Sequence, residues 1–373
     1  MWKRNLIDIL KNMQGQGSRQ KMVAFAVDDY GNVRVNGPAA AKKCLDAGFL
    51  AKSRFDAYDT LETKEDLEAL FEILSRHRDA RGHAAIFTPY AVSGNLDLER
   101  FVKGNGEEVQ VEPLSETFER HSAEFPKVFG GAWDLWQQGL KERLLRPQFH
   151  GGEHFNRLEL QRLWKNEASA LHQILETGSF AFLKGSMHRG IYAAFEYNEL
   201  QEIESHLDGL KEGVQRFESA FGYSPVNFTP PNYSYHQSHL KELASLGVRY
   251  IDTAMWRKEH LGGGKYRQKW HYQGQDLVAG TKAIIRNAVF EPEPNDGIDW
   301  VQGVLKQAEI AFFWNKPLLI STHRVNFCGW MNEKNRSQSL EQLDQLLLAL
   351  RKRWPELWFV SADEMCAEIF EKK

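Results

Sequence analysis

The sequence has little cysteine, no long apolar run and no excess of charge of one sign. Its 373 residues include three cysteines, Cys44, Cys328 and Cys366. They are too few and too scattered for a disulfide framework or a CxxC metal site. No run approaches the roughly 18 apolar residues that a membrane-spanning helix needs. The first residues are basic but lack the apolar core and cleavage site of a signal peptide. We therefore expect a cytoplasmic protein without a transmembrane segment.

The formal net charge of −3 gives no electrostatic case for binding nucleic acid. A hydrophobic content of 42% and a charged content of 26% are those of an ordinary globular protein. The eleven Trp and eleven Tyr offer flat faces that suit sugar rings, although most aromatic side chains serve packing. The chain length fits one α/β barrel with insertions.

Short apolar segments alternate with segments of helical periodicity along most of the chain. This alternation predicts an α/β fold, with a parallel sheet and helices outside it. Predicted strands cover 23–28, 83–88, 147–150, 226–231, 248–252, 283–287, 317–323 and 357–360. Predicted helices cover 37–46, 64–76, 157–177, 198–221, 236–246, 298–312, 337–354 and the chain end, with a short amphipathic helix in 1–20.

The predicted domain organisation is one barrel with an extension and an insertion. Residues 1–20 are an N-terminal extension and 21–373 form the barrel domain. Residues 95–147 are too long for an ordinary connection and are predicted to be an insertion after the second strand, bordering the active site. Its Trp133 and Trp136 are candidates either for stacking on a sugar ring or for anchoring the insertion, and anchoring is favoured for Trp136.

Two adjacent carboxylates end the first predicted strand. Asp28 and Asp29 follow a buried apolar run and precede a Tyr and Gly31. Ligands bind at the carboxyl ends of parallel strands, so this position favours a functional site. Side chains alternate along a strand, so the two carboxylates should point in different directions. The alternative is a polar strand-to-loop boundary with an Asx-turn.

Two histidines follow another strand end in the motif His-Gly-Gly-Glu-His. His150 and His154 are four residues apart, which places both imidazoles on one face of a helical turn. The Glu is out of place for the HExxH motif of metalloproteases. With Asp29, the pair supplies an Asp/His/His set that suits Zn²⁺ or a related divalent metal. The alternative is two surface histidines beside a flexible Gly-Gly.

Two further segments end apolar strands. His323 is a candidate general acid, because imidazole is readily tuned near neutral pH; otherwise it caps a strand. The segment 228–233 runs through a double proline to Tyr233. It is either a rigid loop or the support for a backbone amide and an aromatic ring against a substrate.

In this order, the motifs resemble those of the polysaccharide deacetylase family (carbohydrate esterase family four type). Asp28 and Asp29 look like the first motif, in which the first Asp is the catalytic base and the second a metal ligand. His150 and His154 match the two metal-binding histidines. The resemblance spans residues 21 to about 365. It implies a distorted (β/α) barrel and hydrolysis of an N- or O-acyl group from a sugar or glycan precursor.

Three later segments extend the resemblance. Residues 229–233 are similar to an Arg-Pro-Pro-Tyr motif whose tyrosine amide polarises the oxyanion, which implies a catalytic Tyr233 and a substrate-binding Pro231. Residues 251–256 look like the fourth motif, which implies a substrate-binding Trp256. Residues 319–323 resemble the last motif, whose general acid is here His323. One divalent metal ion is implied, with zinc expected, held by Asp29, His150 and His154.

The sequence departs from the family pattern at several points. Thr229 stands where the family has an Arg that orients the base, and Arg286 or Arg324 is a candidate to replace it. Asn232 lies inside the third motif, and the gap from the first motif to His150 is longer than usual. Two alternatives therefore stand beside a deacetylase: a catalytically inactive carbohydrate-binding protein on this scaffold, or a barrel hydrolase acting on another C–N or glycosidic bond.

Overall fold

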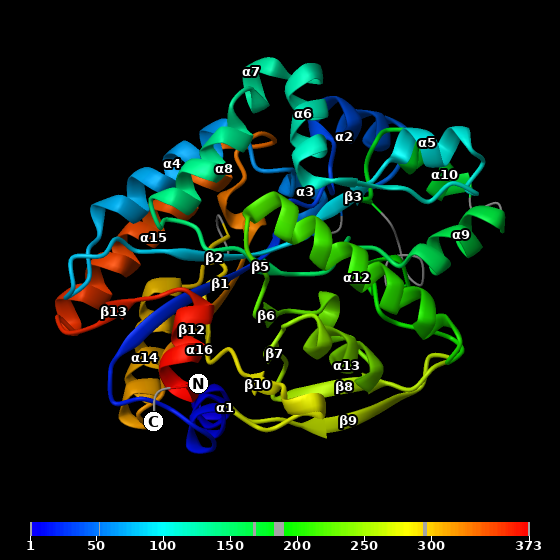
Figure 1. Cartoon of the computed structure of the whole chain (residues 1–373). Coiled ribbons are helices and arrows are strands. Elements are labelled where there is room, and N and C mark those ends of the chain that lie inside the picture. Colours follow the sequence, from blue (N-terminus) through cyan, green and yellow to red (C-terminus); the bar gives the residue numbers. More distant parts are fainter. Residues whose placement is uncertain (1, 52, 167–168, 183–189, 294–296, 372–373) are drawn as a thin grey trace.

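A parallel sheet of nine strands with helices around it forms the centre of the computed structural model (Figure 1). The structure describes residues 2–51, 53–166, 169–182, 190–293 and 297–371. The strand order is β10-β7-β6-β5-β2-β1-β12-β11, and β13 pairs with the start of β1. These strands are β1 (Met22–Tyr30), β2 (Phe87–Ala91), β5 (Gln148–Phe149), β6 (Asn227–Phe228), β7 (Tyr250–Asp252), β10 (Lys282–Ile284), β11 (Ala288–Val289), β12 (Leu318–His323) and β13 (Trp358–Phe359).

Helices lie outside the sheet and follow most strands in the chain. They are α1 (Trp2–Met13), α2 (Gly37–Asp46), α3 (Arg54–Tyr58), α4 (Lys64–Arg76), α5 (Leu98–Lys103), α6 (Leu114–Glu124), α7 (Pro126–Phe129), α8 (Ala132–Lys141), α9 (Arg157–Lys165), α10 (Ser169–Leu175), α12 (Glu202–Phe221), α13 (Gln237–Ser245), α14 (Trp300–Phe313), α15 (Glu333–Arg353) and α16 (Ala362–Phe370). Two further antiparallel pairs are formed by β3 (Gly94–Leu96) with β4 (Val111–Pro113), and by the hairpin strands β8 (Trp256–His260) and β9 (Tyr266–Trp270). The predicted α/β fold is confirmed.

The sheet curls into a distorted, incomplete barrel. A short segment of the chain connects its two edge strands. Edge strand β10 pairs with β7, and edge strand β11 pairs with β12. Only residues 285–287 separate these two edge strands in the sequence. The single strand predicted over 283–287 is therefore wrong, because the chain leaves one edge of the sheet there and joins the other. Arg286 lies in this seam.

Both faces of β1 are buried, as its apolar composition predicts. Phe25 and Val27 belong to the main core between the sheet and the surrounding helices. Ala24 and Ala26 face a second cluster with Tyr90 and residues of α16. The small side chains of β1 thus lie on the face that packs toward α16, and the large ones lie on the face in the main core.

Two other predicted elements differ in detail. The second strand begins at Phe87 rather than residue 83 and runs through Pro89, which lies beside the bulge in β1 between Val27 and Tyr30. A bulge is one of the few places in a sheet where proline is tolerated. The helix predicted over 157–177 is divided into α9 and α10.

The insertion over 95–147 is helical and shares the main core. Its helices α7 and α8 pack against α4, and α6 packs against α12. Trp136 is fully buried, and its indole N–H donates to Glu62 at 2.9 Å. Trp133 is half-buried and packs between Phe118 and Trp136. The aromatic residues of this segment therefore fill space between helices.

Candidate metal and catalytic site

A cleft of about 510 Å³ opens at the carboxyl ends of the strands. Its walls come from the ends of β1, β5, β6 and β12 and from the segments that follow them. The lining residues are Asp28, Asp29, Arg34, Ser53, Phe55, His150, His154, Tyr192, Thr229, Pro230, Asn232, Tyr233 and His323. Six of the eight residues predicted to act in the site are thus in one cavity.

Asp29 adopts a left-handed backbone conformation with φ of 72°. This conformation is uncommon for a residue other than glycine, and such residues concentrate at functional sites. It coincides with the bulge of β1 between Val27 and Tyr30. Because the bulge breaks the regular alternation of side chains, Asp28 and Asp29 both line the cleft, which corrects the expectation that they point apart. They still contact different partners.

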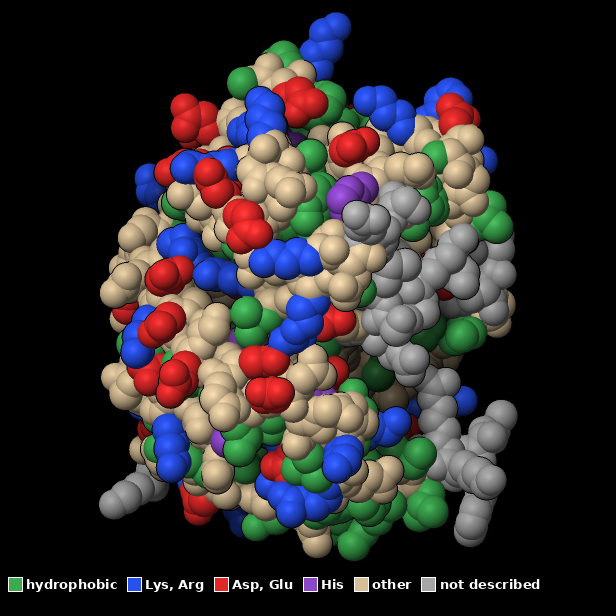
Figure 2. Space-filling model, turned by 90° about the vertical axis from the view of Figure 1, so that its right-hand side faces the viewer, with side chains coloured by type: hydrophobic (Ala, Val, Ile, Leu, Met, Phe, Trp, Pro, Cys, Tyr) green, Lys and Arg blue, Asp and Glu red, His purple; other side chains and the backbone are tan. Residues whose placement is uncertain are grey.

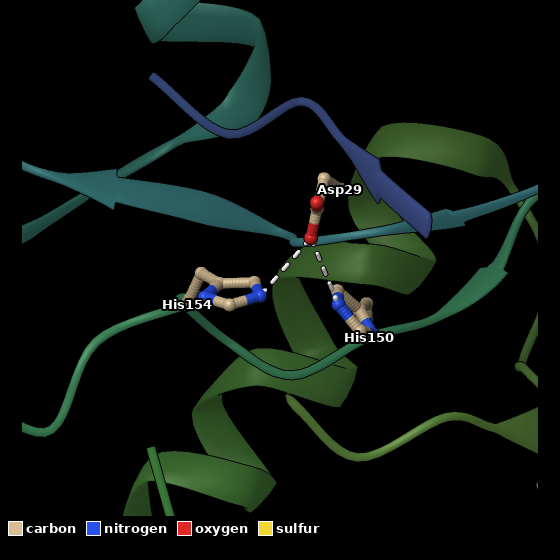
Figure 3. A group of neighbouring side chains, drawn as sticks. All are labelled: Asp29, His150 and His154. Atoms are coloured by element: carbon tan, nitrogen blue, oxygen red, sulfur yellow. Dashed lines mark ion pairs between the residues drawn. The ribbon is translucent and has the colours of Figure 1, made fainter. Parts of the chain in front are cut away.

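Asp29, His150 and His154 converge on one point (Figure 3). The Asp29 Oδ1 lies 3.4 Å from His150 Nε2 and 3.0 Å from His154 Nε2. All three residues are buried, and their candidate ligand atoms lie within 4.8 Å of one another. This set could hold one metal ion.

The hydrogen bonds around the histidines fit a divalent cation. His150 Nδ1 donates to the carbonyl of Thr229 at 2.7 Å, which leaves its buried Nε2 as a lone-pair donor with no hydrogen-bond partner. A backbone carbonyl that fixes the tautomer of a ligating histidine is a common feature of metal sites. Burial alone would raise the pKa of Asp29, but the neighbouring His154 holds it well below its usual value, so the carboxylate is ionised.

The segment between the histidines is a loop, not the helical turn that their spacing suggested. Gly151 has φ of 113°, a conformation that excludes a helix. At Gly152, an added Cβ would lie 3.0 Å from a nitrogen of Arg216, and one on Gly213 would lie 2.7 Å from the Gly152 Cα. The Gly-Gly pair therefore allows a tight loop that packs directly on α12, and this loop carries both imidazoles to Asp29.

Asp28 is held by Arg286, whose Nη1 and Nη2 donate to its two carboxylate oxygens at 2.6 and 2.7 Å. The same guanidinium donates to Asp252 through Nε and to the Thr229 hydroxyl at 3.0 Å. Thr229 in turn donates to Asp252 at 3.0 Å. Of the two candidate arginines, Arg286 is therefore the one whose guanidinium holds Asp28.

Arg324 has a different role. It is 1% exposed and pairs with Asp59 at 2.7 Å and Glu62 at 3.0 Å. Glu62 also accepts from the Gly31 amide and the Trp136 indole. None of these three charged side chains is among the described residues that line the cleft, and the buried network ties the loop after β1 to the insertion.

His323 lines the cleft beside Asp28. Its register partner in β1 is Asp28, and its Nε2 is 3.8 Å from the Asp28 Oδ2. Its Nδ1 bonds to Glu291 at 2.6 Å, and Glu291 also accepts from Asn326 and Arg54. Burial would lower the pKa of His323, but Glu291, with smaller contributions from Asp29 and Asp28, raises it to about 9.

The third motif differs from the expectation. The Tyr233 amide donates to the carbonyl of Pro230 at 2.9 Å, so it is not available to an oxyanion. Pro231 is buried beneath the cleft, whereas its neighbour Pro230 lines the wall. Asn232 and Tyr233 both have positive φ, and the extra Asn reorients the turn, which explains both corrections.

Two other expectations are wrong. Trp256 is 56% exposed on the β8–β9 hairpin, stacks edge-on against Trp270, and does not line the cleft. The lining residues that the structure describes include none from 95–147, because α6 and α8 pack on the outer helices. Trp133 and Trp136 are therefore too far within the helical layer to stack on a substrate in this cleft.

Sequence reasoning missed Glu291 and Asp252 as partners in the site. Glu291 follows β11, and nothing in its local sequence marks it. Asp252 ends β7, so the rule that polar residues at strand ends belong to sites could have found it. Arg34 and Tyr192 also line the cleft, with the guanidinium 4.3 Å from the ring centroid.

Both signs of charge are interspersed over the face of the molecule seen in Figure 2. This distribution agrees with the small net charge. No helix among the residues that the structure describes is long and apolar enough to cross a membrane. The three cysteines are buried and free, as their scatter predicted.

The chain matches no protein-family model and none of the curated proteins. Similar solved structures are distant in sequence. A candidate polysaccharide deacetylase from Mycobacterium smegmatis is 10% identical with a TM-score of 0.45, over 94% of this chain and 90% of that one. A CE4 family pseudoenzyme from Bacillus anthracis is 12% identical with a TM-score of 0.39, over 93% and 65%. A 4-alpha-glucanotransferase from Thermococcus litoralis is 10% identical with a TM-score of 0.46, and this chain spans 94% of itself but only 41% of that enzyme. Likenesses this distant carry no argument about what this chain does.

Proposed function

We propose that this protein is a metal-dependent hydrolase that removes an N- or O-acyl group, such as acetyl, from a sugar or glycan precursor. The observation that carries the proposal is the arrangement in one cleft of a candidate base held by Arg286, a candidate acid held by Glu291, and a candidate metal set. Acyl transfer to water needs these three functions together.

Asp29, His150 and His154 would hold the metal ion. When bound, a divalent ion at this position would supply Lewis acidity to the acyl carbonyl and lower the pKa of water. One carboxylate and two neutral imidazoles suit zinc, and three protein ligands leave positions open for water and substrate. The identity of the ion as zinc is part of this proposal.

Asp28 is the proposed general base. Asp28 lines the same cleft as the metal set, and its carboxylate is fixed by two hydrogen bonds from one guanidinium. Bidentate pairing with Arg fixes the plane of a carboxylate. Asp28 would take the proton from the attacking water, and Arg286 would keep the carboxylate oriented until it does.

His323 is the proposed general acid. The Glu291 carboxylate accepts from Nδ1, so Nε2 is the nitrogen that faces the cleft. With a pKa raised to about 9, the ring is protonated at neutral pH and can give its proton to the leaving nitrogen or oxygen. A bound cation would cancel the contribution of Asp29 to this pKa, but the contact with Glu291 would remain.

The oxyanion donor is assigned by elimination within the third motif. Pro231 has no amide hydrogen, and the Tyr233 amide is bonded to Pro230. We propose that the amide of Asn232 faces the tetrahedral oxyanion, because the described backbone hydrogen bonds include none that it donates. The hydrolysis then breaks the acyl C–N or C–O bond and releases a carboxylate and the free amine or alcohol.

Acetate release from N-acetylated and O-acetylated sugars tests this function. The zinc-loaded full chain should release acetate, and Asp28→Asn should reduce the rate by about 10²-fold or more, the contribution expected of a general base. Zinc-dependent sugar binding without any acetate release would instead support the inactive carbohydrate-binding alternative. Cleavage of a glycosidic bond in the same assay would support a different hydrolase.

A further inference from the structure

The side chain of Tyr233 has a role open to it that its backbone amide does not. The residue lines the cleft and is half-buried. Its hydroxyl makes no hydrogen bond with any residue that the structure describes, and it is not among the polar atoms that are buried without a partner. The phenol therefore offers the cleft a hydrogen-bond donor that a bound molecule can use.

The other hydroxyl groups of the cleft are already engaged. Among the described residues that line it, four carry a hydroxyl, and three of these donate to the protein itself. The three donors are Ser53 to Asp56 at 3.4 Å, Tyr192 to the carbonyl of Phe180, and Thr229 to Asp252 at 3.0 Å. Tyr233 thus carries the cleft hydroxyl that is left for a substrate.

The backbone at Tyr233 is held in a conformation that bulky residues rarely adopt. Its φ is 53°, directly after a φ of 54° at Asn232, and such outliers concentrate at functional sites. Two hydrogen bonds fix this turn: the Tyr233 amide donates to the Pro230 carbonyl at 2.9 Å, and the Asn232 side chain donates to the Tyr192 carbonyl at 2.9 Å. A fixed turn also fixes the direction in which the ring leaves the backbone, which is toward the cleft.

The surroundings of the phenol keep it neutral. Burial raises the pKa of Tyr233 above its usual value, and Arg286 opposes this shift. The carboxylates of Asp252, Asp28 and Glu291 add to the rise in this pKa. The hydroxyl therefore keeps its proton and remains a donor. Because these carboxylates include the proposed base and the partner of the proposed acid, the hydroxyl lies on the side of the cleft where the acyl group would react.

Acyl hydrolysis passes through a tetrahedral oxyanion that needs hydrogen-bond donors. In the segment 229–233, only the Asn232 amide is left for this purpose, because Pro231 has no N–H and the Tyr233 amide is engaged. Oxyanion sites are commonly built from more than one donor, and a tyrosine hydroxyl can serve as one. We propose, on the basis of the function proposed above, that the Tyr233 hydroxyl donates a second hydrogen bond to the tetrahedral oxyanion, beside the Asn232 amide.

The hydroxyl transfers no proton in this role. As water adds to the acyl carbon, the π electron pair of the carbonyl moves onto its oxygen, and the negative charge strengthens the hydrogen bond from the phenol. When the acyl C–N or C–O bond then breaks, the carbonyl forms again and the hydrogen bond weakens. A contact that is stronger to the tetrahedral oxyanion than to the planar carbonyl raises kcat and has little effect on KM.

Calorimetric binding of two small anions to the zinc-loaded full chain tests this proposal. Methylphosphonate has the tetrahedral shape and the charge of the intermediate, whereas acetate is planar. Tyr233→Phe removes the hydroxyl and keeps the ring. It should weaken the binding of methylphosphonate by about tenfold or more, as expected for a lost hydrogen bond to a charged group, and the binding of acetate much less. Its melting temperature should equal that of the wild type, because the hydroxyl bonds to no described residue.

Tyr235→Phe is the matched control. The Tyr235 hydroxyl donates to Thr253 at 3.3 Å and does not line the cleft, so this variant should bind both anions as the wild type does. In acetate release, Tyr233→Phe should lower kcat by about 10²-fold or more at little change in KM, the usual effect of losing one oxyanion donor.

The outcomes separate this inference from the proposed function. Unchanged methylphosphonate binding in Tyr233→Phe, or an equal loss for both anions, would overturn the inference, since another donor would then hold the oxyanion or the hydroxyl would not distinguish it. Acetate release with an unchanged kcat in Tyr233→Phe would overturn it as well and leave the proposed function in place. A wild type that releases no acetate would count against the proposed function, and the difference between the two anions would still decide the role of Tyr233.

Discussion

Arg286 donates to both carboxylate oxygens of Asp28, although the two residues are 258 positions apart in the sequence. The guanidinium reaches Asp28 from the seam of the barrel, between β10 and β11. Thr229, where the resembled family has an arginine, contributes only a hydroxyl to the same group. A short side chain at position 229 leaves room for the guanidinium that comes from the seam.

Replacement of Arg286 should disable Asp28 without removing the metal. Arg286→Lys keeps the positive charge but cannot hold both oxygens. We expect kcat for acyl hydrolysis to fall by about 10²-fold or more, as for loss of a positioned base, while KM and metal content change little. Thr229→Val is the matched control and should have a much smaller effect. Equal losses in the two variants would show that the Thr229 hydroxyl, not the bidentate pairing, positions Asp28.

Metal content should depend on three residues and not on Asp28. Protein purified without chelator should hold about one divalent ion per chain, as expected for a single site. His150→Ala, His154→Ala and Asp29→Asn should lose most of it, because each removes one ligand. Asp28→Asn and the exposed control His83→Ala should keep it when measured by elemental analysis. Metal loss in Asp28→Asn would mean that the two carboxylates share the ion.

The pH dependence of activity should report the contact between Glu291 and His323. A general acid must be protonated, so kcat should fall as the pH rises through the pKa of His323, about 9. Glu291→Gln removes the carboxylate that raises this pKa. The alkaline limb of the profile of kcat against pH should therefore shift to lower pH by about 1 unit or more. Glu293→Gln, an exposed neighbour, should leave the profile in place. If Glu291→Gln lowers kcat but leaves the alkaline limb at the same pH, Glu291 only packs against the ring.

Trp136 should behave as a structural anchor. Trp136→Ala removes a fully buried ring and leaves Glu62 without one of its donors. We expect a loss of roughly 3–5 kcal/mol in the free energy of unfolding, the usual cost of truncating a buried aromatic. Trp133→Ala should cost less, because Trp133 is half-buried. At a temperature where the variants are folded, kcat and KM should stay at the wild-type values; a rise in KM would return these residues to the substrate site.

Acid should destabilise the fold through buried neutral histidines. Burial lowers the pKa of His121 and of His206 to about 4, from 6.5 in the unfolded chain. The folded state therefore binds fewer protons, so stability is complete above pH 6.5 and falls as the pH drops toward 4. Each group can contribute a loss of about 3 kcal/mol across that window. Urea unfolding at several pH values should show that the free energy of unfolding depends less steeply on pH in His206→Leu than in the wild type. An unchanged pH dependence would mean that His206 is protonated in the folded state.

Some features of the site follow from short stretches of sequence. The sequence indicates Asp28, Asp29, His150 and His323 because each ends or follows a buried apolar run, and carboxyl ends of neighbouring parallel strands meet at one edge of a sheet. The α/β fold and most elements follow from the same local patterns of hydrophobicity. The backbone conformation that brings His154 to Asp29 does not follow from the sequence. A spacing of four residues is equally compatible with a helical turn and with the tight Gly-Gly loop that is present.

The sequence by itself therefore determined which side chains stand at the strand ends and what chemistry they offer. Only the tertiary structure decided which partners hold them: Arg286 on Asp28, Glu291 on His323, and the Pro230 carbonyl on the Tyr233 amide. It also placed Trp136 in the core and Trp256 outside the cleft. Local patterns are set by the period of each helix or strand, whereas these contacts join segments that only the closing of the barrel and the packing of its helices bring together.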